Sequence, residues 1–226
     1  MTSIENLAII PARGGSKGIK KKNLRKINGL SLIEITVREI LKSNIFDKVV
    51  LSSDSQEILE HGKSLEIELL KRPKTLALDN SPTEKVIIHV LKKYSKKNKI
   101  QNIGLFQPTS PLRDHKDIRN SFNEFRINKN STLLSVCSVD RKYLKILYED
   151  KKKIRSIKPN FPFMPRQSLP SAFLPNGAIY YSKVSHFLEH ESFFSNNMGL
   201  FDMDTSKSLD IDSEDDLRLA KRLLKS

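Results

Sequence analysis

Short apolar runs alternate with helical repeats along most of this chain of 226 residues. A continuously apolar run is typical of a strand buried on both faces, and apolar residues spaced three or four apart predict an amphipathic helix. The strands predicted in this way are residues 7–12, 48–52, 67–70, 102–106, 132–136, 178–181 and 199–203. Repeated strand–helix units predict an α/β fold with a doubly wound, mostly parallel sheet.

Capping residues mark where several of the predicted helices begin. Ser31 and Ser81 each stand three residues before a glutamate, which is the capping-box pattern. Asp114 and Ser213 are expected to cap two later helices, because their side chains can accept hydrogen bonds from the free N–H groups of a first turn.

The alternation of strands and helices breaks between residues 140 and 175. Two short alternating stretches, 144–148 and 154–157, predict a hairpin, and four prolines follow it. We therefore expect a single domain, residues 1–226, with an inserted arm at about residues 140–175. A lone hairpin is unstable in water, so the arm needs a surface to pack on.

A basic, glycine-rich segment follows the first predicted strand. In ARGGSKG, residues 12–18, two adjacent glycines let the backbone turn tightly and approach a ligand, while Arg13 and Lys17 supply two cations. The spacing matches neither the Walker pattern nor GxGxxG. Taken alone, the segment fits a phosphate-binding loop and a solvated surface loop equally well.

Polar segments also follow other predicted strands. Ligands of doubly wound sheets bind outside the carboxyl ends of the strands. The segments expected to share one crevice there are residues 13–17, 53–54, 107–110 and 210–212. Their convergence favours an enzyme that acts on a phosphorylated ligand.

The formal net charge of +14 indicates a partner that carries negative charge, such as a nucleotide, a nucleic acid or an acidic surface. The lysines form separate clusters rather than one stripe, at residues 20–22, 92–99 and 151–158. The chain has no Trp and no RNP-like run, which argues against an RNA-binding sheet. We expect no nucleic-acid partner and keep a basic nucleic-acid binding module as the distant alternative.

Cys137 is the only cysteine, which excludes an internal disulfide and a thiolate zinc cluster. No apolar run approaches the roughly 20 residues of a membrane helix. The N-terminal residues lack the basic region of a signal peptide. We therefore expect a cytoplasmic protein with no membrane partner.

Six motifs occur in order along the chain: PARGGSKG…KN from residue 11, RPxxLA from 72, QPTSPLR from 107, PRQxLP from 165, PNGAIY from 175 and SLDID from 208. Together they resemble the acylneuraminate cytidylyltransferases, also called CMP-sialic acid synthetases, over almost the whole chain. The resemblance implies a Rossmann-like nucleotidyltransferase fold with a small dimerisation arm. It implies that CTP and a nine-carbon 2-keto sugar acid, an N-acylneuraminate, give the CMP-sugar and diphosphate, with Mg²⁺ as the cofactor.

The resemblance also implies roles for individual residues. The nucleotide-binding positions are Ala12, Arg13, Gly14, Gly15, Ser16, Lys17, Asn23, Arg72 and Thr83. The sugar-binding positions are Gln107, Lys145, Arg166, Gln167, Tyr180, Phe193 and Phe194. The catalytic positions are Arg13, Lys17, Asp210 and Asp212.

Simpler interpretations exist for several of these residues when each is considered alone. Arg72 is more typical of a surface arginine before a proline turn, and Gln107 is equally typical of a residue that caps a turn. Tyr180, Phe193 and Phe194 are more typical of a core than of a ligand contact.

Two acidic pairs could provide the metal ligands, Asp202/Asp204 and Asp210/Asp212. Residues i and i+2 of an extended chain point to the same face, and Mg²⁺ takes one or two carboxylates together with substrate phosphates. The SLDID motif selects Asp210 and Asp212, which we expect in a strand with an apolar opposite face. The alternative is that Asp212 only stabilises the start of the helix that follows it.

One departure from the family pattern concerns the sugar. Leu174 stands where some members carry an arginine directly before PNGAIY. The loss of a cation there would change how the sugar acid is held. A CMP-legionaminic acid synthetase, or the synthetase of a related nonulosonate, is therefore the alternative substrate assignment.

Family members are dimers whose arms reach the neighbouring active site. The predicted arm at residues 140–175 matches that organisation. We expect a homodimer in which Arg166 and Gln167 lie near the active site of the partner subunit.

Overall fold

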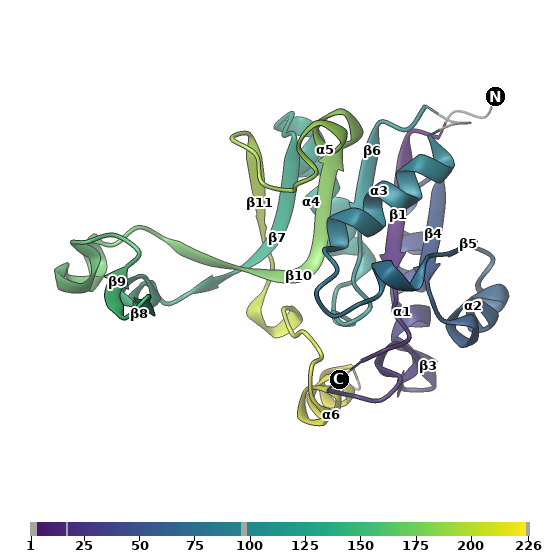
Figure 1. Cartoon of the computed structure of the whole chain (residues 1–226), viewed down its shortest axis with the longest axis horizontal. Helices are drawn as coiled ribbons and strands as arrows, with labels where there is room; N and C mark the ends of the chain where they lie inside the picture. Colours follow the sequence, from purple (N-terminus) through teal and green to yellow (C-terminus); the bar gives the residue numbers. More distant parts are fainter. Residues whose placement is uncertain (1–3, 17, 96–98, 225–226) are drawn as a thin grey trace.

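The computed structural model describes residues 4–16, 18–95 and 99–224 (Figure 1). Its centre is a seven-stranded sheet with the strand order β11-β7-β10-β6-β1-β4-β5. These strands are β1 (Asn6–Pro11), β4 (Lys48–Ser53), β5 (Glu68–Lys71), β6 (Asn102–Leu105), β7 (Thr132–Val139), β10 (Ala172–Lys183) and β11 (Met198–Asp202). The α-helices are α1 (Leu32–Ser43), α2 (Gln56–Gly62), α3 (Thr83–Tyr94), α4 (His115–Ile127), α5 (Val184–His190) and α6 (Glu214–Leu223).

The sheet is mostly parallel, which confirms the predicted fold class. Parallel pairing joins β1 to β4 and β6, β4 to β5, and β7 to β11. Strand β10 is the exception, because it runs antiparallel to both β6 and β7. The chain leaves the sheet along β7 and returns along β10, and a direct return of this kind requires the opposite direction.

Helices cover both faces of the sheet, and the alternation of side chains in β1 explains the two cores. Ala8 and Ile10 pack in one buried cluster with residues of α1 and α4. Leu7 and Ile9 pack in the other with residues of α3 and α5. Successive strand residues point to opposite faces, so four consecutive apolar residues fill both cores at once.

Three of the four predicted caps form, at Ser31, Asp114 and Ser213. The predicted capping box at Ser81 is wrong. Helix α3 begins at Thr83 with Pro82 at the N-cap position and no side-chain cap. The Ser81 hydroxyl instead donates a hydrogen bond to the Thr75 carbonyl oxygen at 2.8 Å, within the loop that precedes the helix.

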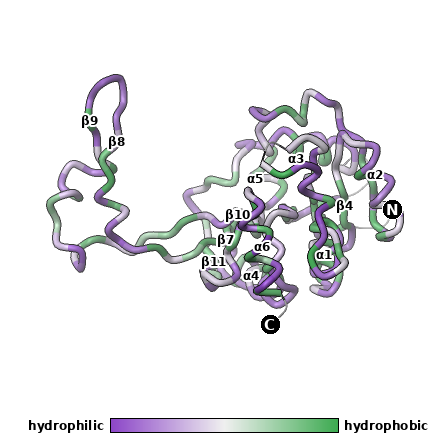
Figure 2. Tube along the Cα trace, turned by 90° about the horizontal axis from the view of Figure 1, so that it is seen from below, coloured by the Kyte–Doolittle hydropathy of each residue, from purple (hydrophilic) through white to green (hydrophobic). Residues whose placement is uncertain are grey.

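The arm projects from the sheet where β7 and β10 continue beyond it (Figures 1 and 2). It carries the predicted hairpin, formed by β8 (Leu147–Asp150) and β9 (Lys153–Ser156) as a separate antiparallel pair. Several large apolar side chains on it are exposed, including Phe163 at 88% and Ile154 at 69%. Among the described residues, no helix has the length and apolar character to cross a membrane.

The buried cap of α1 gives a test of the fold. The Ser31 hydroxyl accepts from Glu34 N at 3.1 Å and lies 2.9 Å from His61 Nε2. Ser31→Ala should lower the free energy of unfolding by about 2 kcal/mol, the upper range for a lost cap, because Ser31 is fully buried. Ser213→Ala removes an exposed cap and should lower it by about 1 kcal/mol. Urea unfolding measures both, and equal losses would contradict the role of burial.

Candidate active site

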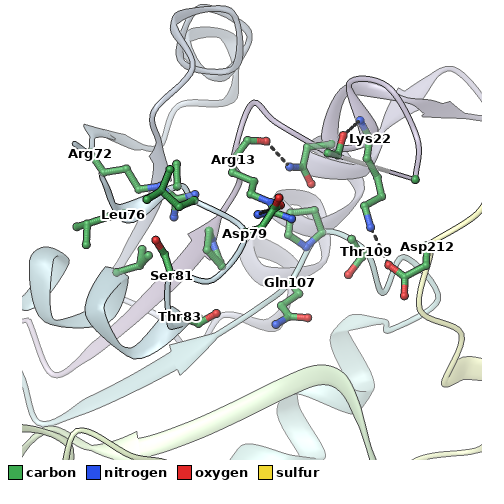
Figure 3. A pocket seen from close by; sticks show the side chains of 18 of the residues that line it. Arg13, Lys22, Arg72, Leu76, Asp79, Ser81, Thr83, Gln107, Thr109 and Asp212 are labelled. Atoms are coloured by element: carbon green, nitrogen blue, oxygen red, sulfur yellow. Dashed lines mark hydrogen bonds and ion pairs between the residues drawn. The ribbon is translucent and has the colours of Figure 1, made fainter. Parts of the chain in front are cut away.

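A pocket of about 420 Å³ opens at the carboxyl ends of the central parallel strands (Figure 3). Its walls come from segments far apart in the sequence, as predicted for a doubly wound sheet. The residues with side chains or backbone on it include Arg13, Ser16, Lys22, Asn23, Arg72, Asp79, Ser81, Thr83, Gln107, Thr109, Asp210 and Asp212. Of the segments expected to converge, only residues 53–54 do not line it.

Asp54 holds the glycine-rich loop in place and lies in the turn between β4 and α2. Asp54 Oδ1 accepts a hydrogen bond from Gly14 N at 3.1 Å. A Cβ atom at Gly14 would lie 2.8 Å from the Cβ atom of Ser55, so only glycine fits there. The Ser16 hydroxyl closes the loop by donating to Ile19 O at 2.5 Å. Lys17 lies outside the described residues.

Two arginines bring positive charge to one side of the pocket. Arg13 Nη1 lies 2.8 Å from Asp79 Oδ1, on the loop before α3. Arg72 is 5% exposed, and its Nε finds no hydrogen-bond partner among the described residues. Desolvation lowers the pKa of Arg72, the Asp54 carboxylate opposes that shift, and the Arg13 charge adds to it. A buried guanidinium with an unused donor is suited to bind an anionic or hydrogen-bonding ligand.

The other side of the pocket holds Lys22 and the two aspartates of SLDID. Lys22 Nζ lies 2.9 Å from Asp212 Oδ1 and donates to Ile211 O at 2.8 Å. The expected strand at residues 210–212 is wrong, since this segment is irregular. Its anchor is Ile211, which is fully buried and donates its N–H to Thr109 O at 2.8 Å.

The Asp210 carboxyl has a pKa above its ordinary value. The residue reaches solvent, but the protein around the carboxylate desolvates it, and this effect raises the pKa most. The negative charges of Asp212 and Asp216 raise it further, while a hydrogen bond from Thr109 and the charge of Lys22 lower it. A bound cation would relieve the repulsion between the two carboxylates.

These residues fit a magnesium ion that is shared with a nucleotide. No group of three His, Cys, Asp or Glu side chains in the described ranges could hold an ion by itself. Mg²⁺ usually takes one or two carboxylates and completes its shell with water and phosphate oxygens, which is what Asp210 and Asp212 could provide. The competing pair does not line the pocket, and Asp202 accepts hydrogen bonds from Ser138 N and Oγ at 3.1 and 2.6 Å.

Gln107 lies at the end of the pocket that faces β10. A Cβ atom at Gly177 would lie 3.1 Å from Gln107 Oε1, and Gly177 has φ +75°, so glycine is required beside this amide. Arg113 holds the same two segments together, because its Nη1 donates to Ala178 O at 2.8 Å and to Gln107 O at 3.3 Å. Complete burial lowers the pKa of Arg113 to about 10.

The three aromatic residues predicted to contact the sugar are placed differently from one another. Tyr180 is half-buried and is not among the residues that line the pocket; desolvation first, and then the charges of Asp210 and Glu84, raise its pKa. Phe193 is buried and packs against the rings of Tyr180 and Phe187, at centroid distances of 5.2 and 5.1 Å. These are the contacts of a core residue. Phe194 is 72% exposed.

The remaining predicted sugar-binding residues lie on the arm. Arg166 forms an ion pair with Asp140 at 3.0 Å. Arg166 and Gln167 line a separate hollow of about 390 Å³, and Lys145 ends the 3-10 helix at Arg141–Lys145. A single chain therefore does not bring these three residues to the main pocket (Figure 1).

The sequence did not predict roles for several residues at the pocket. Asp79 stands in a polar loop without a motif. Lys22 belongs to the KN at the end of the first motif, which marked its position but not its role. Thr109 and Arg113 lie inside QPTSPLR, so the motif marked their segment but not their roles.

Comparison with known proteins agrees with this arrangement. Residues 7–225 match the model of the family described as Cytidylyltransferase. The chain belongs to the cytidylyltransferase family. Its mostly parallel sheet is therefore that of a nucleotidyltransferase.

Individual members of this family are named for different sugar acids. The chain is 35% identical over 229 residues to the "Post-translational flagellin modification protein B" of Campylobacter coli, covering 98% of this chain and 95% of that one. It is 35% identical over 225 residues to the CMP-N,N'-diacetyllegionaminic acid synthase of Campylobacter jejuni, covering 97% and 95%. It is 31% identical over 216 residues to the N-acylneuraminate cytidylyltransferase of Escherichia coli, covering 95% of this chain but 51% of that relative.

Solved structures support the fold of this cytidylyltransferase. A CMP:2-keto-3-deoxy-manno-octonic acid synthetase in complex with CTP superposes with a TM-score of 0.76 at 13% identity, covering 98% of both chains. A 4-diphosphocytidyl-2C-methyl-D-erythritol synthase superposes with a TM-score of 0.69 at 11% identity, covering 99% of this chain and 100% of the other.

The raised pKa of Asp210 predicts that this residue destabilises the fold at neutral pH. Above its folded-state pKa, Asp210 is ionised in both states, and the folded state carries the free-energy cost of a desolvated carboxylate near other negative charges. Below the ordinary pKa of 3.8, Asp210 is neutral in both states and this cost vanishes. Asp210→Asn should therefore raise the melting temperature at pH 7, and the gain should shrink on acidification.

Asp212→Asn is the matched control, because Asp212 forms an ion pair with Lys22 that this substitution removes. It should leave the melting temperature unchanged or lower it. Calorimetry of both variants without added metal makes the comparison, and a lower melting temperature for Asp210→Asn at pH 7 would contradict the prediction.

Proposed function

We propose that this cytidylyltransferase activates a nonulosonic acid, a nine-carbon 2-keto sugar acid, by converting it with CTP to the CMP-sugar and diphosphate. The observation that carries the proposal is a pocket beside the glycine-rich loop that has Arg13 and Arg72 on one side and Lys22, Asp210 and Asp212 on the other. Relatives named for nonulosonates match nearly the whole chain, which supports the class of sugar acid.

The reaction requires charge neutralisation and positioning more than covalent help from the protein. The anomeric hydroxyl of the sugar acid attacks the α-phosphorus of CTP, the bond from that phosphorus to the bridging oxygen breaks, and diphosphate leaves. The hydroxyl proton is released to water. Arg13 and Lys22 provide charge-assisted hydrogen bonds to the phosphates, and Arg72 with Thr83 lines the part of the pocket for the nucleoside.

Asp210 and Asp212 would hold Mg²⁺ on the phosphate side of this pocket. The ion would supply positive charge to the phosphate oxygens when it is bound. Lys22 keeps Asp212 turned toward the pocket through its 2.9 Å contact. Thr109 fixes Asp210 from the loop after β6.

N-acetylneuraminate is the substrate that the six motifs favour. The second candidate is N,N'-diacetyllegionaminate, and two observations favour it. Leu174 replaces a cation in the motif region and is 58% exposed on β10, and a relative named for this sugar is 35% identical over 97% of the chain.

Diphosphate release from CTP with each sugar acid tests the function and separates the candidates. We expect turnover with a nonulosonate and Mg²⁺, and none without the sugar. Asp210→Asn and Asp212→Asn should each lower the rate by about 10² or more, as the loss of a charge-stabilising group does. Asp204→Asn is the matched control and should retain the wild-type rate, because Asp204 caps the turn at Thr205–Lys207 outside the pocket.

A lack of turnover with any nonulosonate would refute the proposed function. A clear preference for N,N'-diacetyllegionaminate would refute the assignment of N-acetylneuraminate. Loss of activity in Asp204→Asn, with normal rates in the other two variants, would move the metal ligands to the competing pair.

The assembly that we propose is a homodimer in which each arm extends toward the active site of the partner subunit. The support is that Arg166 and Gln167 lie on an arm away from the pocket of their own chain, and that the arm exposes large apolar side chains. Exposed apolar clusters of this kind are typical of protein interfaces.

Light scattering at micromolar concentration should therefore give the mass of two chains of 25.9 kDa. Phe163→Ser, which removes an arm side chain that is 88% exposed, should shift the protein toward monomer and lower turnover. Ile127→Ser is the matched control, since Ile127 is 77% exposed at the end of α4. A wild-type monomer peak, or the same shift in both variants, would contradict the dimer.

A further inference from the structure

The loop between the 3-10 helix at Lys74–Leu76 and α3 carries a carboxylate into the nucleotide pocket. Asp79 lines the pocket and lies 2.8 Å from Arg13, measured from Oδ1 to Nη1 (Figure 3). Leu76, Ala77, Leu78 and Ser81 of the same loop also line it. One wall of the pocket is therefore joined to the glycine-rich loop by an ion pair between pocket residues.

The shape of this loop does not depend on the ion pair. Ser81 N donates to Leu78 O at 3.0 Å, and the Ser81 hydroxyl donates to Thr75 O at 2.8 Å, so hydrogen bonds inside the loop close it. The side chains of Arg13 and Asp79 are 36% and 49% exposed. An ion pair this exposed adds little to folding stability. Its larger effect is on the charge that Arg13 offers to a ligand.

The other two pocket cations also lie near acids. Asp212 pairs with Lys22 and belongs to the proposed metal pair. Asp54 acts on the charge of Arg72 and also accepts the Gly14 N–H. Asp79 lies on an exposed loop, and its Oδ1 contacts Nη1 of Arg13, a residue that lines the pocket.

We propose that Asp79 is an affinity-determining residue that competes with the nucleotide phosphates and with diphosphate for Arg13. The Nη1 donor that contacts Asp79 is not free for a phosphate oxygen, so CTP displaces Asp79 when it takes this donor. After the transfer, the carboxylate of Asp79 returns to Arg13 and promotes the release of diphosphate. This inference rests on the proposed function, which supplies CTP as the nucleotide and diphosphate as the leaving group.

Competition of this kind discriminates among ligands by their charge. A triphosphate or diphosphate carries several negative charges and can displace one carboxylate, whereas a phosphate with a single charge gains less from doing so. The effect should weaken as salt rises, because the ions screen partly exposed charges.

Isothermal titration of the full-length chain with sodium diphosphate, and separately with CTP, tests the proposal. Asp79→Asn keeps the size of the side chain and removes its charge. Both dissociation constants should fall about two- to fivefold, which is the factor that an exposed ion pair is worth. Product inhibition by diphosphate should strengthen by a similar factor. Asp79→Ser, as a second variant, should give the same direction.

Two controls identify Arg13 as the point of competition. Glu57→Gln removes the same charge from an ion pair with Lys21 at 2.6 Å, with side chains 53% and 54% exposed, and it does not line the pocket. It should leave both dissociation constants unchanged. In an Arg13→Gln background, Asp79→Asn should no longer tighten diphosphate binding.

Each other result overturns the inference. Weaker CTP binding in both Asp79 variants would mean that Asp79 contacts the nucleotide directly. Unchanged binding would mean that the ion pair does not compete. Equal tightening in Glu57→Gln would mean that bulk charge is responsible. Persistence of the effect without Arg13 would mean that Arg13 is not the group for which Asp79 competes. Failure of the proposed function is separate, since it would appear as absent turnover by the wild type while diphosphate binding still reports on Arg13.

Discussion

The hydrogen bonds at the ends of the parallel strands are the constraint on which the site depends. Strand β1 lies between β4 and β6, and its residues from Leu7 to Ile10 are completely buried. Beyond its end, Ala12 N still donates to Ser52 O at 3.0 Å, which fixes where the glycine-rich loop begins. In the same way, Arg72 N donates to Ser53 O at 2.8 Å and Ile211 N donates to Thr109 O at 2.8 Å. Main-chain hydrogen bonds therefore fix the backbone of three walls of the pocket, and this fixes where the side chains on those walls begin.

Paired charges let the pocket collect cations without a large self-repulsion. Arg13 is paired with Asp79 and Lys22 with Asp212, while Arg72 is buried near Asp54. The net charge of +14 would otherwise concentrate positive potential at these adjacent residues. The cost of this arrangement is that a ligand must exchange one set of ionic contacts for another. A polyanion can make this exchange, because one ligand brings several negative charges to the pocket cations, whereas each aspartate brings only one.

The sequence was sufficient for the fold class and for much of the pocket, and physical reasons explain what it did not predict. Continuous apolar runs such as Leu7 to Ile10 identify parallel strands because both faces are buried. They do not report the direction of a strand such as β10, which depends on where the chain returns. The segment 210–212 has the alternation of a strand, but within the described residues it joins no sheet, and Ile211 N donates instead to the carbonyl oxygen of Thr109 in a loop. An aromatic residue such as Phe193 has the same sequence signal in a core as in a ligand site. The ion pairs of Lys22 with Asp212 and of Asp79 with Arg13 join residues far apart in the sequence, so no local pattern predicts them.

The antiparallel strand β10 links the arm to the part of the pocket near Gln107. The chain leaves along β7, forms the arm, and returns with a register shift between Pro175 and Tyr180. Gly177 lies in that irregular stretch, directly beside the Gln107 amide. The carbonyl oxygen of the next residue, Ala178, accepts the buried hydrogen bond from Arg113. Asn176, on the other side, is fixed by a 2.6 Å hydrogen bond from the Ser135 hydroxyl of β7. The backbone that returns from the arm therefore also borders the Gln107 amide and accepts the hydrogen bond of Arg113, so the arm and this end of the pocket share one strand.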